Sequence, residues 1–317
     1  MRRALLVLTL LVLACCAAAD PDTRDARLGC TLNRLAEMPL ETHGDLLFVR
    51  ARIAAAPVLL LVDTGAERTL LTEAAVERLR LPRDHQHATR TYGIGSSTAS
   101  WDAVLPDGLT LGNARFPLDG VTVGRFSMIR VGGAPADGLL GADVLLAFDV
   151  DLDVPNRRLT IYRARHGCLQ AGPPWSGPYI RLTGITTRQD RMLLPFRLDG
   201  VTGLGVLDTG AQLSTISLRM AERLGLDEAD LRADGTVMAH GAAPDQVPVR
   251  LHRFRELQVG STVVHWPTLP VVEMSDGMGD ALVGADFLQG RRIWLSFATS
   301  RVFVTPLEPG AAIARAR

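Results

Sequence analysis

The chain repeats itself, and this internal repeat limits its fold more than any other feature of the sequence. Residues 61–66 read Leu-Val-Asp-Thr-Gly-Ala, and residues 206–211 read Val-Leu-Asp-Thr-Gly-Ala, at an offset of 145. A second segment, Leu-Leu-Gly-Ala-Asp at 139–143, returns as Leu-Val-Gly-Ala-Asp at 282–286. Two copies of one pattern in 317 residues predict two homologous lobes, each large enough to bury its own core.

The repeat also divides the chain into segments. We predict a linker between the lobes because Gly172-Pro173-Pro174 and Gly177-Pro178 break regular structure. The leader could serve as a propeptide, a cover or an added strand. The predicted segments are a signal peptide (1–19), the leader (20–43), an N-terminal lobe (44–165), the linker (166–178), a C-terminal lobe (179–307) and a disordered tail (308–317).

Each lobe has the pattern of short strands separated by turns. Apolar runs bounded by turn residues predict strands over 46–53, 56–62, 193–198 and 204–207. One short helix per lobe is expected, over 73–80 with Thr72 as its N-cap and over 218–224 with Ser217 as its N-cap. Many short strands with few helices predict an all-β fold.

Asp63 and Asp208 carry the chemistry that two such motifs make available. Each follows an apolar strand and precedes a Gly that permits a tight turn, and a twofold-related pair of lobes can bring identical motifs together. Two carboxyls about 3 Å apart cannot both ionise, so they share a proton and titrate as a pair. One then takes a proton from water while the other protonates a carbonyl oxygen. The pattern predicts peptide hydrolysis by activated water.

The segment Leu-Val-Asp-Thr-Gly-Ala-Glu-Arg-Thr-Leu-Leu resembles the active-site strand of retropepsin-like aspartic peptidases. The two apolar-apolar-Gly triplets are similar to the strand that this family threads behind its active-site loop. The resemblance covers about residues 45–306 and is to a fused, single-chain version, as in bacterial aspartyl protease proteins. It implies two retropepsin/pepsin-like β-barrel lobes with a cleft between them, in a monomer that needs no cofactor.

The resemblance also implies roles for single residues. Asp63 and Asp208 match the catalytic pair of the family. The expected supporting residues of the two active-site loops are Thr64, Gly65, Ala66, Thr209, Gly210 and Ala211.

The family further implies flaps, which are β-hairpins that fold over a bound peptide. Tyr-Gly-Ile-Gly-Ser lies about thirty residues after Asp63, and Ala-His-Gly-Ala-Ala lies at the matching distance after Asp208. Gly supplies hinge freedom at such tips. An ordinary hairpin turn is the alternative at each place. The expected flap and substrate-binding residues are Tyr92, Gly93, Ile94, Gly95, His240 and Gly241.

Two further acids follow the Gly of the second repeated segment, at Asp143 and Asp286. They could be read as additional catalytic acids. An Asp just past a Gly more often caps a helix, so we expect these residues to cap short helices over 144–146 and 287–289.

The first residues have the form of an export signal. Positive charges at Arg2 and Arg3 precede an apolar stretch over 4–14, which is too short to span a bilayer, so no transmembrane span is expected. The small residues up to Ala19 favour cleavage there. The alternative is a lipobox-like segment that would put a lipid anchor on Cys15. Either route exports the chain, and we expect a periplasmic or secreted protein.

Cys30 and Cys168 are the only cysteines beyond the signal segment. An exported protein meets an oxidising compartment, where a single remaining pair tends to form a disulfide. We therefore predict a bridge between them. Two buried free thiols are the alternative.

Several other functions find no support in the sequence. The net charge is zero, so no nucleic-acid-binding surface is indicated. The histidines are scattered without a His-Glu-x-x-His motif, so no metal site is predicted. Ser96 and Ser97 follow Gly95 but lack the closing Gly of a serine-hydrolase elbow. The expected partner is a peptide or protein substrate.

One alternative function stays open. A catalytically inactive or highly target-restricted peptide-binding protein of the cell envelope would have the same fold, and an extended peptide would still bind as an added strand. A binder has no need of both acids and both turn glycines. The sequence therefore favours an aspartic endopeptidase.

Overall fold

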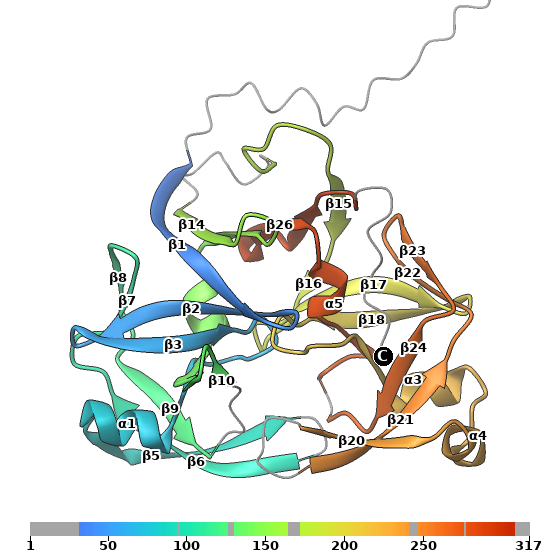
Figure 1. Ribbon diagram of the computed structural model, residues 1–317, viewed down its shortest axis with the longest axis horizontal. Coiled ribbons are helices and arrows are strands. Elements are labelled where there is room, and N and C mark those ends of the chain that lie inside the picture. The colour runs from blue at the N-terminus through green and yellow to red at the C-terminus, as the bar shows by residue number, and fades with distance from the viewer. Residues whose placement is uncertain are drawn as a thin grey trace, which may run out of the picture.

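Two β-rich lobes lie side by side, and a shared sheet spans them at the top of the view in Figure 1. The computed structural model describes residues 32–93, 96–125, 130–163, 172–240, 246–275 and 277–307. The predicted signal segment with Cys15, both residues of the predicted Cys30–Cys168 bridge, part of the linker and the tail lie outside these ranges. The bridge and the anchor therefore stay predictions.

The strands of the N-terminal lobe are β1 (Asn33–His43), β2 (Leu46–Ile53), β3 (Ala56–Val62), β4 (Leu70–Thr72), β5 (Arg83–Gly93), β6 (Ser96–Val104), β7 (Leu109–Leu111), β8 (Ala114–Phe116), β9 (Gly120–Gly124) and β12 (Gly138–Leu140). They pair in the order β1-β2-β3-β12-β4-β9-β6-β5, with β7 beside β2 and β8 beside β7. Strand β12 runs parallel to β3 and antiparallel to β4. It therefore passes between the strand that precedes Asp63 and the strand that follows it.

The strands of the C-terminal lobe are β16 (Ile185–Thr186), β17 (Met192–Leu198), β18 (Val201–Leu207), β19 (Thr215–Ser217), β20 (Thr236–His240), β21 (Gln246–Arg253), β22 (Glu256–Val259), β23 (Thr262–His265), β24 (Thr268–Val272) and β25 (Ala281–Val283). Strand β25 lies parallel to β18 and antiparallel to β19, as β12 lies between β3 and β4. The prediction of two homologous all-β lobes is confirmed.

A third set of strands joins the lobes: β13 (Asp149–Asp153), β14 (Arg158–Arg163), β15 (Ile180–Thr183), β26 (Arg292–Ser296) and β27 (Arg301–Val304). The order β15-β27-β26-β13-β14-β1 places β13 of the first half directly against β26 of the second half. Strand β1, which lies in the segment predicted as a leader, completes this sheet. Its alternating buried residues Ala36, Met38 and Leu40 explain why it forms a strand.

The core strands next to Asp63 and Asp208 match the sequence closely. Strands β2 and β3 have the predicted bounds, whereas β17 begins one residue and β18 three residues before the predicted start. Strands β2 and β3 are buried over continuous runs or at alternate positions. The apolar residues of the sequence follow the same pattern.

One set of hydrogen bonds repeats in both lobes and shows that the two lobes have equivalent positions. The Asp137 amide donates to the Leu59 carbonyl at 2.8 Å, and the Asp280 amide donates to the Leu204 carbonyl at 2.7 Å. Each of these Asp side chains also accepts from the amide of the same leucine, at 2.8 and 3.0 Å. The pairs Asp137/Asp280 and Leu59/Leu204 therefore occupy equivalent positions.

The N-terminal lobe has an insertion near the opening between the lobes. Twelve residues (125–136) separate β9 from Asp137, whereas seven (273–279) separate β24 from Asp280. The extra residues include the hairpin of β10 (Arg130–Val131) and β11 (Ala134–Pro135). The two walls of the opening are therefore not equivalent.

The helices are α1 (Glu73–Leu79), α2 (Ala142–Leu145), α3 (Leu218–Arg223), α4 (Glu228–Ala233) and α5 (Ala285–Leu288), with a short 3-10 helix at Phe297–Thr299. The hydroxyls of Thr72 and Ser217 accept from backbone amides at the starts of α1 and α3, so both predicted N-caps are confirmed. Helix α4 was not predicted from the sequence, and its start is fixed by a capping box at Asp227. None of the helices in the described ranges is long and apolar enough to cross a membrane.

Candidate active site

Two equivalent loops place Asp63 and Asp208. Each Asp follows a buried strand, β3 or β18, and precedes the turn at Gly65 or Gly210. The strand that threads behind each loop holds its backbone. The Asp63 amide donates to the Leu140 carbonyl at 3.0 Å, and the Asp208 amide donates to that of Val283 at 2.9 Å. The apolar-apolar-Gly strands therefore lie where the family resemblance implied.

The backbone amides of each loop hold its carboxylate. The Oδ1 atom of Asp63 accepts from the amides two and three residues further on, at 3.0 and 2.9 Å. The Oδ1 atom of Asp208 accepts from the corresponding amides at 2.9 and 3.1 Å. One oxygen of each carboxyl is thereby fixed, and the other is left to face the partner loop.

The threonines after the two acids lock the loops together. The Thr64 hydroxyl donates to the Leu207 carbonyl at 2.6 Å and accepts from the Thr209 amide at 3.1 Å. The Thr209 hydroxyl makes the mirrored contacts, to the Val62 carbonyl at 2.6 Å and from the Thr64 amide at 3.1 Å. Both side chains are buried. These four hydrogen bonds cross from one lobe to the other and fix the relative position of the two acids.

Thr64→Val is expected to weaken this junction. The variant keeps the shape of Thr64 but removes its hydroxyl, so the Leu207 carbonyl and the Thr209 amide lose that partner. Each buried group left without a hydrogen bond costs about 1–3 kcal/mol. Chemical denaturation should show a lower unfolding midpoint for Thr64→Val, whereas Thr64→Ser should unfold near the wild type. Equal midpoints for Thr64→Val and the wild type would contradict the role of the hydroxyl.

Gly65 and Gly210 allow the two loops to approach each other face to face. A Cβ atom built on Gly65 would lie 2.5 Å from Cγ of Asp208, and one built on Gly210 would lie 2.4 Å from Cγ of Asp63. No side chain fits at either place. The turn glycines are therefore required by the contact across the lobes.

The two carboxyls face each other across the lobes, each close to the turn glycine of the opposite loop. Asp208 is buried, and Asp63 is half-buried. Burial raises the pKa of Asp63 well above its ordinary range, and the negative charge of Asp208 raises it further. Burial also raises the pKa of Asp208, but hydrogen bonds from loop amides and from Asp63, together with the charge of Arg191, act against this. The pKa of Asp63 is therefore raised further than that of Asp208.

The sequence model of the aspartyl protease family matches the chain twice, at residues 49–144 and 194–287. These segments cover more than half of the chain, and each contains one of the paired acids. The chain belongs to the aspartyl protease family. The predicted tandem, single-chain arrangement is confirmed, because both family segments lie in one polypeptide.

The fold of this aspartyl protease is similar to that of the aspartic proteinase from Irpex lacteus. The two superpose with a TM-score of 0.51 at 14% sequence identity, over 88% of this chain and 99% of that chain. At this identity the likeness shows the fold alone. No curated protein matches the sequence significantly.

Both predicted flap segments of the aspartyl protease lie on β-hairpins. Strands β5 and β6 pair up to Gly93 and Ser96, and β20 and β21 pair up to His240 and Gln246. The exposed Tyr92 side chain lies near the first tip, with 63% of its surface accessible. The other predicted tip residues, Ile94, Gly95 and Gly241, lie outside the described residues. Figure 1 shows the two hairpins extending toward each other along the bottom of the molecule.

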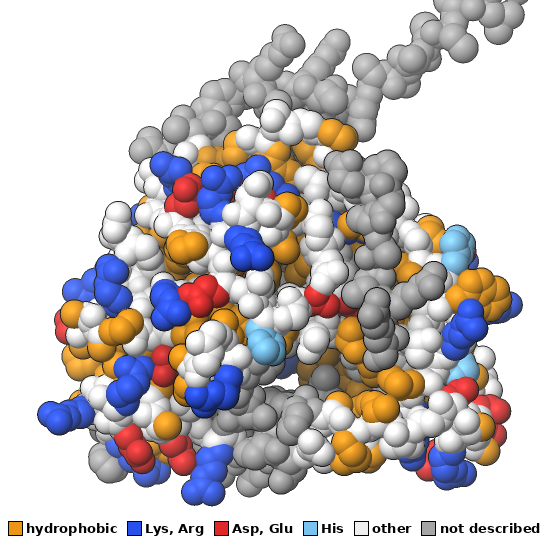
Figure 2. Space-filling view, in the orientation of Figure 1, with side chains coloured by type: hydrophobic (Ala, Val, Ile, Leu, Met, Phe, Trp, Pro, Cys, Tyr) orange, Lys and Arg blue, Asp and Glu red, His pale blue; other side chains and the backbone are white. Residues whose placement is uncertain are grey.

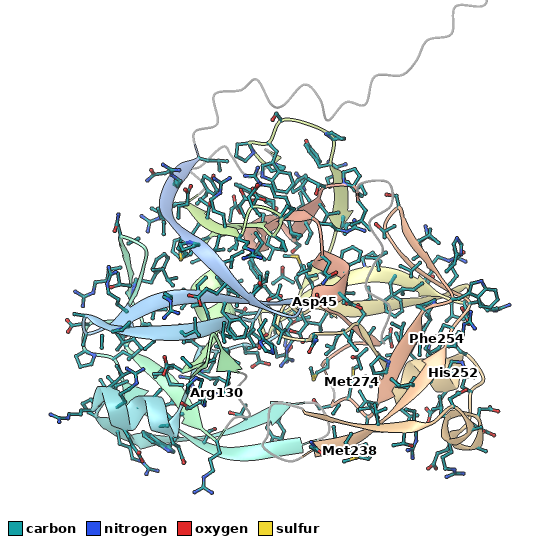
Figure 3. The ribbon with its side chains drawn as sticks, viewed as in Figure 1. Asp45, Arg130, Met238, His252, Phe254 and Met274 are labelled. Carbon is teal, nitrogen blue, oxygen red and sulfur yellow. The ribbon has the colours of Figure 1, made fainter. Side chains whose placement is uncertain are left out.

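An apolar cluster lines the C-terminal lobe between its active-site loop and its hairpin. Ala211 of the loop and Ala239 of β20 both pack on it, so the cluster spans the distance between them. Figure 3 places Met274 and Arg130 on opposite sides of the opening between the lobes, and Figure 2 shows the surface hollowed there. The buried members are Val206, Val249, Val272, Met274, Met278 and Leu282.

Asp143 and Asp286 do not cap helices, and this prediction was wrong. The N-caps of α2 and α5 are Gly141 and Gly284, without a side-chain cap. The Asp143 carboxylate instead accepts from the amide and hydroxyl of Thr69, at 2.9 and 2.7 Å. Each hydroxyl residue six places after a paired acid is bound in this way, because the Gly strand passes directly behind the loop.

The C-terminal lobe has the equivalent of the Asp143–Thr69 contact, and both of its residues are buried. The Asp286 carboxylate accepts from the amide and hydroxyl of Ser214 at 2.9 and 2.7 Å. The Ser214 hydroxyl in turn accepts from the Gly284 amide at 3.0 Å. Asp286 therefore ties the active-site loop to the strand behind it, without contact to the paired carboxyls.

Asp286→Asn is expected to flatten the pH dependence of stability. Burial raises the pKa of Asp286, so the folded protein keeps a proton that the unfolded chain loses near its ordinary pKa of about 3.9. This stabilisation is complete below the unfolded pKa and is lost as the pH rises through the folded pKa. Asn does not titrate, and it keeps the oxygen that accepts from Ser214.

Urea unfolding between about pH 4 and 7 checks this expectation. The free energy of unfolding should fall with rising pH more steeply in the wild type than in Asp286→Asn. Asp143→Asn is the matched control, because solvent reaches Asp143 and its contribution to the slope should be smaller. Parallel slopes for the wild type and Asp286→Asn would contradict the expectation.

Arg191 is a residue of the site that the sequence analysis missed. It lies just before β17 in the C-terminal lobe, yet it contacts the active-site loop of the N-terminal lobe. Its Nε donates to the Gly65 carbonyl at 3.1 Å, and its Nη2 pairs with Glu67 at 3.0 Å. The sequence feature that could have pointed to Arg191 is that it stands where the first copy of the repeat has an apolar residue, Leu46. The structure shows that Leu46 is buried.

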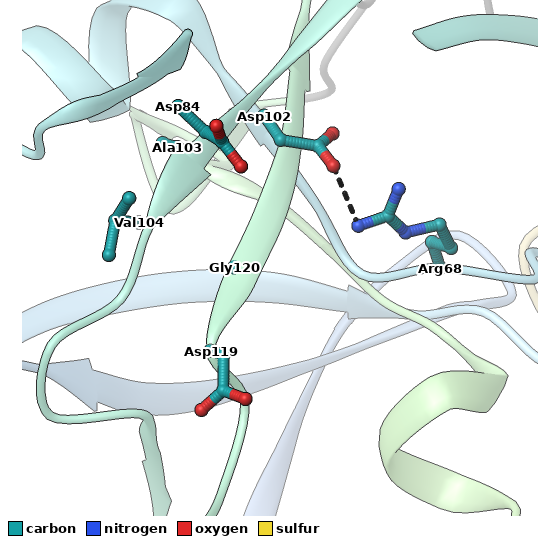
Figure 4. A pocket seen from close by; sticks show the side chains of 7 residues that line it. All are labelled: Arg68, Asp84, Asp102, Ala103, Val104, Asp119 and Gly120. Carbon is teal, nitrogen blue, oxygen red and sulfur yellow. Dashed lines mark hydrogen bonds and ion pairs between the residues drawn. The ribbon is translucent and has the colours of Figure 1, made fainter. Parts of the chain in front are cut away.

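A separate cavity of about 340 Å³ lies in the N-terminal lobe (Figure 4). Arg68 at its edge donates to the Asp102 carboxylate at 3.0 Å, and Thr122 donates to the same carboxylate at 3.1 Å. Neither paired acid lines this cavity, so it plays no part in their arrangement. Within the described ranges, no group of three or more His, Cys, Asp or Glu side chains is arranged to hold a metal ion.

Proposed function

We propose that this aspartyl protease is an endopeptidase that hydrolyses peptide bonds of extended protein or peptide substrates with Asp63 and Asp208. The observation that carries this proposal is the close approach of the two active-site loops, in which each carboxyl lies against the turn glycine of the opposite loop. Hydrolysis by activated water needs a base and an acid at one place, and a pair with a single proton supplies both. Two mirrored sets of loop contacts hold the pair in position.

In the proposed mechanism a water molecule is held between the carboxyls. Its oxygen attacks the carbonyl carbon while the ionised carboxylate takes one of its protons, and the protonated carboxyl gives its proton to the carbonyl oxygen. The resulting neutral gem-diol then returns one hydroxyl proton to the dyad. The dyad protonates the leaving nitrogen as the carbon–nitrogen bond breaks. The pair ends with one proton, as it began.

The loop residues act by positioning. Thr64 and Thr209 keep the two carboxyls at one relative distance, and the small Gly65 and Gly210 let them meet. The hairpins that carry Tyr92 and His240 would close over the substrate. The apolar cluster under the second hairpin supports a preference for cleavage beside hydrophobic residues.

We further propose that this activity takes place outside the cytoplasm. The support is the signal-like N-terminus and the Cys30/Cys168 pair, both features of the sequence. A lipid on Cys15 would keep the enzyme at the envelope surface, whereas cleavage after Ala19 would release it.

Incubation of the purified protein with a peptide library at about pH 4–6 tests the proposal, because a carboxyl pair with one proton works in that range. Mass spectrometry should detect internal cleavage, and a statine-type transition-state analogue should block it. Binding of peptides without any cleavage would favour the alternative, an inactive peptide-binding protein of the same fold.

A further inference from the structure

We propose that Arg191 is a positioning residue that makes Asp208 the ionised member of the pair and leaves the proton on Asp63. Asp208 would then be the base that activates water, and Asp63 the acid. This assignment rests on the proposed peptidase function and deepens it, because a symmetric pair of motifs does not by itself say which acid has which role.

The position of Arg191 places a cation behind one carboxyl. Its guanidinium donates to the Gly65 carbonyl, and the side chain is only 13% exposed. Gly65 in turn lies so close to the Asp208 carboxyl that an added Cβ would be 2.5 Å from Cγ. One glycine therefore separates the cation from the Asp208 carboxylate. The positive charge favours the ionised form of Asp208 and lowers its pKa, against the effect of burial.

No equivalent cation lies at the matching position of the other lobe. In the hairpin of β2 and β3, Phe48 pairs with Leu61, and in the hairpin of β17 and β18, Leu193 pairs with Val206. Two residues before Phe48 is Leu46, so Leu46 is the counterpart of Arg191. It is 3% exposed and carries no charge.

The neighbouring turn between β1 and β2 carries an acid, Asp45, and no arginine or lysine. The active-site loop of the C-terminal lobe continues into Gln212, where the other loop has Glu67. A Cβ on Gly44, in the turn between β1 and β2, would lie 3.1 Å from the Gln212 amide nitrogen. Each lobe thus lies against the active-site loop of the other, through an ion pair at Glu67 on one side and beside the neutral Gln212 amide on the other.

Other charged groups lie near Arg191, and some of them weaken its effect on the pKa of Asp208. Glu67 pairs with it, but the Glu67 side chain is 43% exposed, so water screens its charge more than that of Arg191. Arg68 of the same loop is engaged by Asp102. Asp190 precedes Arg191 in its own turn and is partly exposed. A Cβ built on Gly277 would lie 3.8 Å from the Arg191 guanidinium, and this segment contains two acids, Glu273 and Asp276, of which Asp276 lies outside the described residues.

Arg191→Met tests the assignment through the pH profile of kcat/KM. The acid limb of this profile reports ionisation of the base in the free enzyme. Without the cation the acid limb should move upward by about one pH unit, the order expected for loss of an opposite charge at close range. Methionine suits the site, because the other lobe has a buried leucine at this position. Arg191→Lys keeps the charge and should restore the wild-type limb.

Glu67→Gln separates this electrostatic role from a merely structural one. It breaks the same ion pair but leaves the Arg191 charge without its counterion. The acid limb should therefore move downward, opposite to the shift in Arg191→Met. If Arg191 only clips the lobes together, the two variants should shift the limb in the same direction or leave it unmoved. Either result would overturn the proposal.

A titration by nuclear magnetic resonance gives a readout that does not depend on activity. In protein with ¹³C-labelled aspartate, the Asp208 carboxyl signal is assigned by its loss in Asp208→Asn. Its titration midpoint should rise in Arg191→Met and fall in Glu67→Gln. A wild-type protein that cleaves no peptide would end the proposed function, whereas an unmoved Asp208 midpoint in Arg191→Met would end the role of Arg191.

Discussion

Asp208→Asn is expected to reduce peptide cleavage to background. An amide cannot take the proton from water, and general acid–base catalysis contributes about 10²–10⁴-fold to a rate. Asparagine keeps the oxygen that accepts from the loop amides, so the fold and the loop contacts should survive. Asp63→Asn should have the same effect, because the reaction needs both members of the pair. The measurement is the initial rate on a peptide cleaved by the wild type at acidic pH.

Asp227→Asn serves as the matched control for both variants. Asp227 is an exposed helix cap of α4, and asparagine caps helices as well as aspartate does. Its cleavage rate should equal that of the wild type. Clear residual cleavage in purified Asp63→Asn or Asp208→Asn, blocked by the same statine-type analogue, would contradict the assignment of the pair.

Gly210→Ala is expected to cost about 100-fold or more in kcat/KM. The added methyl would lie 2.4 Å from Cγ of Asp63, so the carboxyl, the loop or the lobe must move. A displacement of about 1 Å in reacting groups can cost two orders of magnitude. The backbone of Gly210 does not have the positive φ that an alanine would resist, so the effect comes from the contact across the lobes. Gly65→Ala should lower kcat/KM to a similar degree, because its added methyl would meet the Asp208 carboxyl.

Gly120→Ala adds the same methyl group in β9, away from the pair. Its nearest contact would be the Ala103 carbonyl at 3.2 Å, which calls for a small local adjustment. This variant should keep most of the wild-type kcat/KM. A Gly210→Ala enzyme as active as Gly120→Ala would show that the two loops do not meet as closely as described.

The sequence was enough to predict the parts of the site that repeat. Asp63 and Asp208 stand at matched points of two copies, and the apolar runs before them have the periodicity of buried strands. The N-caps at Thr72 and Ser217 are local features and were also predicted. All of these depend on residues close in sequence or on the repeat itself.

Features that depend on contacts between distant segments could not be predicted in the same way. Asp143 has the sequence context of a helix cap, but its carboxylate binds Thr69, 74 residues earlier. Arg191 precedes a strand like many surface arginines, and only the docking of the lobes brings it to Gly65, 126 residues away. The hairpin at Arg130 interrupts the repeat, so comparison of the two copies gave no counterpart for it.

The central claim is that one chain supplies both carboxyls of one active site. A tight-binding statine-type inhibitor, titrated against a known concentration of protein at acidic pH, tests it most directly. The structure predicts that cleavage activity falls to zero at one equivalent of inhibitor per chain. An end point at half an equivalent would mean that two chains build each site, and would contradict the account.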